Sequence, residues 1–338
     1  MATLETQQLD EIIVKTRRKM LTMGGAALAA LAFGGTTKAE AQSTTTPDQD
    51  ILNFALNLEY LEAQFYNLAV SGVTIDNLPT PIPVAVNGGT AGTVTLKPSF
   101  AAVPFVSSIV KAYAAETATE EGKHVLFLQK TLGSVAVSMP DIDLFKSFNA
   151  LANLAGIGTS FDPFANDQNF LIGAYIFEDV GVSAYHGAAP LIADKKGILP
   201  AALGLHAVEA YHAGLIRTVI SAYDNGVSTG PLSTITQAIS AARSTLANPD
   251  PKNPITSPFI TYAGLTADDQ GVQTTPVSLN GSSTSPAFTS TTIADTDLNA
   301  LGWSRNSTQI LAIVTGNPAT ATAFTGGFFP SGLNGTIS

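Results

Sequence analysis

"AVEAYHAGLIRTV", residues 207–219, places His212 three positions after Glu209. The stretch "EEGKHVLFLQ", residues 120–129, repeats this arrangement with Glu121 and His124. Residues three positions apart lie on one face of an α-helix, so each pair can present a carboxylate oxygen and an imidazole nitrogen to the same point. The chain has only four histidines, and two of them carry this pattern. The two stretches therefore predict two helices that supply matching ligands to one site.

Apolar residues at helical spacing predict an all-α fold with four main helices. The expected helices cover residues 48–70, 103–132, 167–186 and 200–222. Gly187 and Pro190 should end the third helix near Ala188, and Pro200 suits the first turn of the fourth. Residues 134–166 form a long connection with a short helix at 141–154. Short links within each pair and a long crossover between the pairs are typical of a ferritin-like four-helix bundle, here residues 48–223.

Two further segments complete the expected organisation. Residues 72–100 are rich in Pro, Gly, Val and Thr, and Asn87-Gly88 indicates a hairpin-like insertion between the first two helices. Residues 224–338 form a C-terminal extension packed on the bundle. We expect a helix at 232–247, a loop-rich stretch at 248–296 and a short helix at 307–315 in this extension.

The first and third helices each supply one more carboxylate, Glu59 and Glu178. One Glu from each of two helices and a Glu-x-x-His pair from each of the other two form the ligand set of di-iron and di-manganese carboxylate bundles. Four carboxylates also balance two divalent ions, whereas without metal they would repel one another and take up protons. We therefore predict that Glu59, Glu121, His124, Glu178, Glu209 and His212 bind two ions of iron or manganese, because oxygen and imidazole ligands suit both metals.

An internal symmetry supports this set. Tyr66 follows Glu59 by seven residues, and Tyr185 follows Glu178 by seven residues. Two helical turns separate the members of each pair, so each tyrosine shares a face with its glutamate. We expect Tyr66 and Tyr185 to hydrogen-bond ligand carboxylates, although they could also be core aromatics.

The remaining glutamates and histidines have weaker assignments. Glu62 corresponds to Gly181 in the second half and has no symmetric partner. Three glutamates are expected either in solvent or in contact with the ligand side chains without binding metal themselves: Glu62, Glu116 and Glu120. His186 and His206 match no ligand pattern and are expected to be structural or at the surface.

Composition excludes several classes of protein. The chain has no cysteine, hence no disulfide, thiol nucleophile or thiolate metal site. Its net charge of −10 and pI near 4.7 argue against nucleic-acid binding.

Residues 1–41 have the features of an export signal. Arg17 and Arg18 precede an apolar run at residues 21–33, and Ala39 and Ala41 form a small-residue cleavage pattern before Gln42. The paired arginines resemble a twin-arginine signal, although an ordinary secretory signal or an uncleaved anchor is an alternative. The apolar run is too short to span a bilayer, so we expect no membrane insertion after the signal is removed. The predicted location is periplasmic or extracellular, and the predicted partner is the twin-arginine export machinery.

The motifs together resemble a known family. The segments "ILNFALNLEYLEAQFY", "ETATEEGKHVLFLQ", "FEDVGVSAYHGAAPLI", "AVEAYHAGLIR" and "GGFFPSGLNG" are similar to the ferritin-like proteins that include the plant desiccation-related proteins and their bacterial and fungal relatives. The resemblance covers about residues 48–338. It implies a ferritin-like bundle, export and a link to stress, without one settled reaction. The ligand set is similar to those of ferritins, rubrerythrins and manganese catalases, but the chain has no cysteine for a rubredoxin-type iron centre.

Three functional hypotheses remain at this point. The chain could be an exported redox enzyme that reacts with O₂ or H₂O₂, either catalase-like or iron-oxidising. It could instead be a stress-protective structural protein in which metal only stabilises the bundle. A metal-free bundle whose carboxylates pair among themselves is the third hypothesis. Assembly into an oligomer is compatible with each of them.

Overall fold

The computed structural model describes residues 46–227, 229–248, 269–277, 288–296 and 301–338. The export signal expected at residues 1–41 therefore lies outside the described residues. Within the described part of the chain, no helix is both long enough and apolar enough to cross a membrane.

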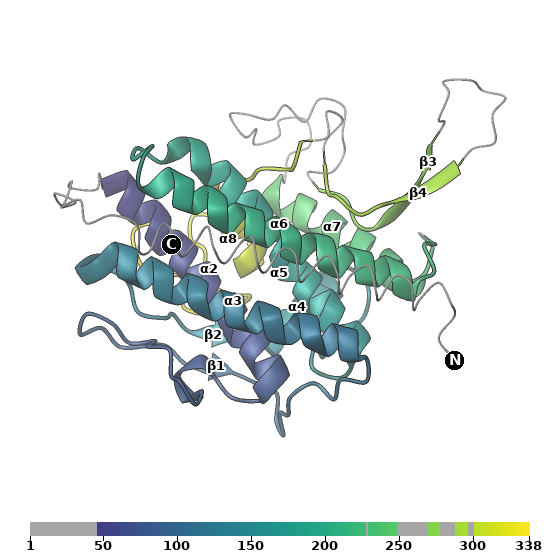
Figure 1. The fold of residues 1–338 in the computed structure, drawn as a ribbon, viewed down its shortest axis with the longest axis horizontal. Helices are drawn as coiled ribbons and strands as arrows, with labels where there is room; N and C mark the ends of the chain where they lie inside the picture. Colours follow the sequence, from purple (N-terminus) through teal and green to yellow (C-terminus); the bar gives the residue numbers. More distant parts are fainter. Residues whose placement is uncertain (1–45, 228, 249–268, 278–287, 297–300) are drawn as a thin grey trace. The chain divides into compact units, whose positions relative to one another are not determined.

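Four long helices dominate the fold: α2 (Thr46–Ser71), α3 (Ser108–Leu132), α5 (Asp167–Ala188) and α6 (Ile198–Tyr223). Helix α2 packs along α3 and α5 packs along α6, while α2 also contacts α5 and α3 contacts α6 (Figure 1). A crossover of more than thirty residues separates the end of α3 from the start of α5. The all-α class and the four-helix bundle with a long crossover are therefore confirmed.

Helix α3 begins later than its apolar pattern indicated. Ser107 is the N-cap, and its side chain accepts a hydrogen bond from the N–H of Val110. The carboxylate of Asp167, at the start of α5, accepts the N–H groups of Val106 and Ser107. These side-chain acceptors satisfy the donors that a helix leaves open at its start, so the helix begins at Ser108 rather than near residue 103.

The hairpin-like insertion at residues 72–100 is a correction to the sequence-based expectation. The turn at Asn87 and Gly88 is formed, with φ of 53° and 76°, but its two arms do not pair with each other. Both arms bond to the crossover instead, because Val84 O accepts the N–H of Met139 at 2.8 Å and Met139 O accepts the N–H of Gly92 at 2.7 Å. Strand β1 (Val94–Thr95) then pairs in parallel with β2 (Ile142–Asp143).

Shorter elements complete the described fold. The crossover contains η2 (Gly133–Val135) and α4 (Lys146–Leu154), and η1 (Ile75–Asn77) follows α2. In the extension, α7 (Pro231–Ala247) packs on α5 and α6, and α8 (Ser307–Thr315) packs on α7 and α5. The described residues of the stretch at 248–296 include a feature that the sequence did not predict, an antiparallel pair of β3 (Gln273–Val277) and β4 (Phe288–Thr292).

Helix α5 ends near Ala188 and continues into the short helix η3 (Ala189–Leu191), as Pro190 predicted. Gly187 has a different role from the expected helix stop. A Cβ atom at this position would lie 1.9 Å from the carbonyl oxygen of Arg305. Gly187 therefore allows the backbone of the extension to lie directly against α5.

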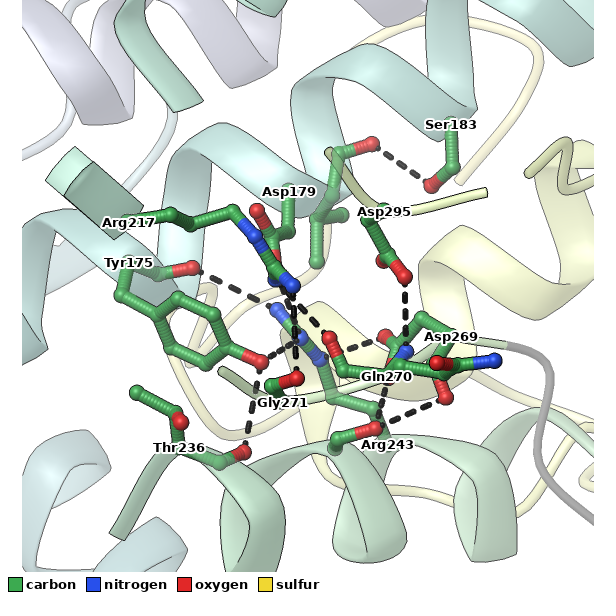
Figure 2. Close-up of polar contacts among 12 residues, drawn as sticks. Tyr175, Asp179, Ser183, Arg217, Thr236, Arg243, Asp269, Gln270, Gly271 and Asp295 are labelled. Carbon is green, nitrogen blue, oxygen red and sulfur yellow. Dashed lines mark hydrogen bonds and ion pairs between the residues drawn. The ribbon is translucent and has the colours of Figure 1, made fainter. Parts of the chain in front are cut away.

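A buried cluster of arginine and aspartate side chains joins the extension to the bundle (Figure 2). Asp179 on α5 accepts ion-pair contacts from Arg217 on α6 at 2.9 Å and from Arg243 on α7 at 3.2 Å. Asp269 in the extension contacts Arg243 at 2.9 Å and Arg305 at 2.7 Å. Charges removed from water are tolerated only when they are paired and hydrogen-bonded. The packing of the extension on the bundle therefore depends on these ion pairs.

Candidate metal centre

The six candidate ligands meet in the interior of the bundle. They come from four helices, and all six residues are 6% exposed or less. The contributing residues are Glu59 of α2, Glu121 and His124 of α3, Glu178 of α5, and Glu209 and His212 of α6. Because i and i+3 positions share a helix face, one turn of α3 and one turn of α6 each point a carboxylate and an imidazole inward.

Ligand atoms of these residues form two overlapping groups. The first group contains Glu59, Glu121, His124 and Glu209, and the second contains Glu121, Glu178, Glu209 and His212. Within each group the candidate atoms lie within 4.8 Å of one another. Glu121 and Glu209 belong to both groups, so their carboxylates lie between the two positions and each could bridge a pair of ions.

Short contacts define the two positions. His124 Nδ1 lies 3.2 Å from Glu59 Oε2 and 3.2 Å from Glu121 Oε2. His212 Nδ1 lies 3.0 Å from Glu121 Oε1 and 3.4 Å from Glu178 Oε2. In each position the same ring nitrogen, Nδ1, is turned toward the carboxylates.

The donor atoms fit a pair of divalent ions. Among the described residues, several buried atoms of this cluster form no hydrogen bond: Glu121 Oε1, Glu178 Oε2, His212 Nδ1 and both carboxylate oxygens of Glu209. Buried polar atoms without hydrogen bonds are rare, and each calls for a partner. Four carboxylates with two imidazoles supply hard oxygen and nitrogen donors, which suit iron and manganese.

Two tyrosines hold the outer carboxylates. Tyr66 of α2 donates a short hydrogen bond to Glu178 Oε1 of α5, and Tyr185 of α5 donates one to Glu59 Oε1 of α2. The pairing is crosswise, since α2 and α5 are antiparallel and each tyrosine therefore lies level with the glutamate of the other helix. Both tyrosines were expected to support ligand carboxylates, but their partners could not be identified from helix periodicity alone.

Comparison with known proteins identifies the domain. A family profile described as "Ferritin-like domain" matches residues 47–222, which is more than half of the chain. The chain belongs to the ferritin-like domain family. It is also similar to the desiccation-related protein PCC13-62 of Craterostigma plantagineum, with 33% identity over 176 residues. That match covers 51% of this chain and 53% of the relative, so the chain spans about half the length of the curated relative it matches. No solved structure matches significantly.

Glu62 of the ferritin-like bundle lies beside the centre without a symmetric counterpart. A Cβ atom at Gly181 would lie 2.9 Å from Glu209 Oε2 and 3.5 Å from Glu62 Oε1. The missing side chain at Gly181 thus leaves room for both carboxylates. Glu62 also borders a small, mostly apolar cavity that Val314 and Phe328 of the extension help to close and that can hold about one water-sized molecule.

Glu120 contacts the centre from its outer side. Its Oε2 atom lies 2.8 Å from Nε2 of His212, and its side chain is 31% exposed. The sequence predicts Glu120 either in solvent or in contact with a ligand side chain. In the structure the Glu120 side chain is partly exposed to solvent and also contacts His212. Glu116 lies one helical turn earlier and is half-buried.

The two other histidines do not join the six candidate ligands. The rings of His186 and His206 lie 5.7 Å apart, and His186 Nδ1 contacts the carbonyl oxygen of Trp303 at 3.1 Å. Burial lowers the pKa of His206, and the neighbouring His186 lowers it further. Both residues are half-buried, and they form a separate contact between α5, α6 and the extension.

The cluster has strongly shifted proton affinities in the metal-free protein. Burial raises the pKa of Glu59 to about 7, although His124 opposes the shift. Burial also raises the pKa of Glu209 and of Glu62 well above the usual range, and neighbouring carboxylates add to both shifts. Burial alone would raise the pKa of Glu121 too. The effect of His124 and His212 is larger, so the pKa of Glu121 is lowered. Without metal, this ferritin-like centre therefore holds protons shared between carboxylates and imidazoles.

Proposed function

We propose that this chain is an exported di-metal protein that binds two ions of iron or manganese and uses them for redox chemistry on H₂O₂ or O₂. The observation that carries the proposal is the pair of overlapping ligand groups that share Glu121 and Glu209. A shared pair of carboxylates brings two ions into the same buried site, where a two-electron reaction can occur without release of a one-electron product.

The donor set supports iron or manganese over other ions. Glu59 and His124 would hold one ion, and Glu178 and His212 would hold the other. Zinc favours four donors in a closed tetrahedral site, and calcium favours oxygen ligands alone, whereas mixed carboxylate and imidazole donors are common for iron and manganese. Such ions, when bound, supply electrons by cycling between the divalent and trivalent states.

Residues of the chain support peroxide chemistry around this centre. In peroxide disproportionation, one H₂O₂ is oxidised to O₂ and loses two protons and two electrons, while a second H₂O₂ takes these up and becomes two molecules of water. The carboxyl group of Glu62 borders the cavity that can hold about one water-sized molecule, and burial raises its pKa, which favours the protonated form. Tyr66 and Tyr185 orient the outer carboxylates, and Val314 and Phe328 of the extension line part of the cavity beside Glu62.

The test is metal loading followed by two assays. Metal-free full-length chain would be loaded separately with Mn²⁺ and Fe²⁺, and bound metal would be counted by elemental analysis. Oxygen release from H₂O₂ and oxidation of added Fe²⁺ would then be measured. We expect close to two ions per chain and turnover in at least one assay, both lost in Glu121→Gln and Glu209→Gln. Lys97→Ala, which alters a partly exposed ion pair outside the centre, is the matched control.

A structural role for the metal is the second candidate. The observation in its favour is that all six candidate ligands are almost fully buried, which restricts access to small molecules. The curated relative is named a desiccation-related protein, which is compatible with protection rather than turnover. Two ions bound with no reaction toward H₂O₂ or Fe²⁺, together with a lower melting temperature after metal removal, would decide for this role.

Export is proposed on the basis of the paired Arg17 and Arg18 and the apolar run that follows them. The twin-arginine route is suited to a protein that folds around its ions before it leaves the cytoplasm. We propose a periplasmic or extracellular location on this basis.

A further inference from the structure

The two halves of the bundle supply equivalent residues to the centre, with two exceptions. Glu59 corresponds to Glu178, Tyr66 to Tyr185, Glu121 to Glu209, and His124 to His212. The first exception is Glu62, whose counterpart is Gly181. The Glu62 carboxylate lies near Glu209, which belongs to both ligand groups, so Glu62 does not distinguish the two metal positions. The second exception is Glu120, which immediately precedes Glu121, whereas Val208 precedes Glu209.

The two ring nitrogens of His212 face different groups, because Nε2 contacts Glu120 whereas Nδ1 points into the centre. Nδ1 of His212 faces Glu121 at 3.0 Å and Glu178 at 3.4 Å, inside the centre. Nε2 faces outward and lies 2.8 Å from Glu120 Oε2. A proton on Nε2 is held by the carboxylate, which leaves the lone pair on Nδ1 for a ligand. A carboxylate behind an imidazole also increases its basicity and fixes its ring orientation.

At the corresponding position of the other half, the chain has no carboxylate. Val208 occupies the position that corresponds to Glu120, and a valine side chain cannot accept a hydrogen bond from an imidazole. His124 is therefore oriented without a carboxylate from that position. Apart from this difference and Glu62, the two halves are alike at the centre. Both outer glutamates accept a hydrogen bond from a tyrosine, and both histidines turn Nδ1 toward the carboxylates.

We propose that the two metal positions are unequal and that Glu120 is the positioning residue responsible. The position formed by Glu178 and His212 binds its ion more tightly and fills first, and the position formed by Glu59 and His124 fills second. This inference rests on the proposed two-ion centre and adds to it the order of loading. Loss of a carboxylate behind a histidine ligand typically weakens metal binding by about 10- to 100-fold, which is the difference expected here.

The experiment is a titration of the metal-free full-length chain with Co²⁺, which is followed by its visible absorption and by calorimetry. Co²⁺ reports ligand geometry and requires no turnover. We expect wild-type chain to bind two ions in two steps separated by about 10- to 100-fold. Glu120→Val makes the outer residues of the two halves alike, so it should weaken the first step by this factor and bring the two steps together. Glu120→Gln keeps a hydrogen-bond acceptor and should show a smaller loss.

Two further variants and one further measurement sharpen the test. Glu116→Gln removes a carboxylate one turn away on α3 and should leave both steps unchanged, which separates the direct contact from a general loss of negative charge. Val208→Glu places a carboxylate on the equivalent side of His124 and should tighten the second step. In Zn²⁺-loaded protein, ¹⁵N NMR should show the His212 proton on Nε2, with a changed Nε2 shift in Glu120→Val.

Equal affinities for the two ions in the wild-type chain would overturn the inference and leave the two-ion centre standing. Unchanged steps in Glu120→Val would overturn it as well. If no Co²⁺ binds at all, the proposed function fails together with the inference. Because the Glu120 side chain is partly exposed, the variant should fold, and circular dichroism would establish this before the titration.

Discussion

The hydroxyl group of Tyr185 on α5 donates a hydrogen bond to Glu59 on α2, 126 positions away in the sequence. Its symmetric counterpart, Tyr66, bonds Glu178 in the opposite direction between the same two helices. Each outer carboxylate is thus held by a buried phenol from the neighbouring helix. One carboxylate oxygen is used by the tyrosine, and the other oxygen is turned toward a histidine.

Tyr185→Phe should weaken metal binding at the position of Glu59 and His124. Without the phenol, the Glu59 carboxylate loses the contact that fixes its orientation, and a loss of about 10-fold or more in Co²⁺ affinity is expected. The measurement is a Co²⁺ titration of the metal-free chain. Tyr60→Phe is the control, because Tyr60 is also buried but its hydroxyl contacts Gln129, outside the six candidate ligands. Equal effects of the two substitutions would show that Tyr185 has no specific role.

Bound metal should stabilise the fold in either functional role. Each ion that binds the native centre and not the unfolded chain should raise the free energy of unfolding by roughly 2.7 kcal/mol at a hundredfold excess over its Kd. Urea unfolding with and without Mn²⁺ measures this change. The same addition to Glu209→Gln should have little effect, since that variant lacks one of the two shared carboxylates. Equal stabilisation of both proteins would point to binding elsewhere.

The metal-free protein should lose stability as the pH rises from about 4.5 to about 7. The folded-state pKa of Glu59 is raised from 4.5 to about 7, so over this window the folded chain keeps a proton that the unfolded chain releases. The stabilising contribution of the protonated Glu59 is therefore fully present below about pH 4.5. As the pH rises past 7, the free energy of unfolding falls by up to about 3 kcal/mol because this contribution is lost. Urea unfolding at several pH values should show this slope, and Glu59→Gln should reduce it.

Protons and metal should also compete for the centre. As the pH falls below about 7, Glu59 takes up a proton in the metal-free form, so metal affinity should decrease. A Co²⁺ affinity that does not change between pH 5 and 8 would contradict this part of the prediction.

Asp179→Ala should destabilise the protein far more than loss of a surface ion pair. The substitution leaves the guanidinium groups of Arg217 and Arg243 buried without the carboxylate that both contact, and such a loss typically costs about 3–5 kcal/mol. Lys97→Ala breaks an ion pair whose side chains are 27% and 35% exposed, and about 1 kcal/mol or less is expected. Urea unfolding compares the two. Similar losses would mean that the cluster in Figure 2 does not anchor the extension.

Replacement of both Arg17 and Arg18 by lysine should block export. Lysine keeps the charge but lacks the planar guanidinium group, so a receptor that recognises the arginine pair should not accept it. Fractionation of cells that express the two forms would show the variant as a precursor in the cytoplasm and the wild-type chain outside it. Export of the variant at the normal rate would favour the general secretory route.

The sequence by itself determined the main helices and which Glu and His side chains, the candidate ligands, face the interior. Helix formation and facing depend on residues three to seven positions apart, and these short distances are visible in Glu121 with His124 and in Glu59 with Tyr66. The error at the hairpin of residues 72–100 has the same origin. Its turn is local and was found, whereas the partner of its arms is the distant segment near Met139.

Only the tertiary structure decided which residues meet across helices. The crosswise bonds of Tyr66 and Tyr185, the contact of Glu120 with His212, and the pairing of Asp179 with Arg243 each join residues more than sixty positions apart. Helix periodicity specifies the face on which a side chain lies, but it contains no information on the relative height and direction of two packed helices. Those are set by packing of the whole core, and this packing brings the carboxylate of Glu120 to His212.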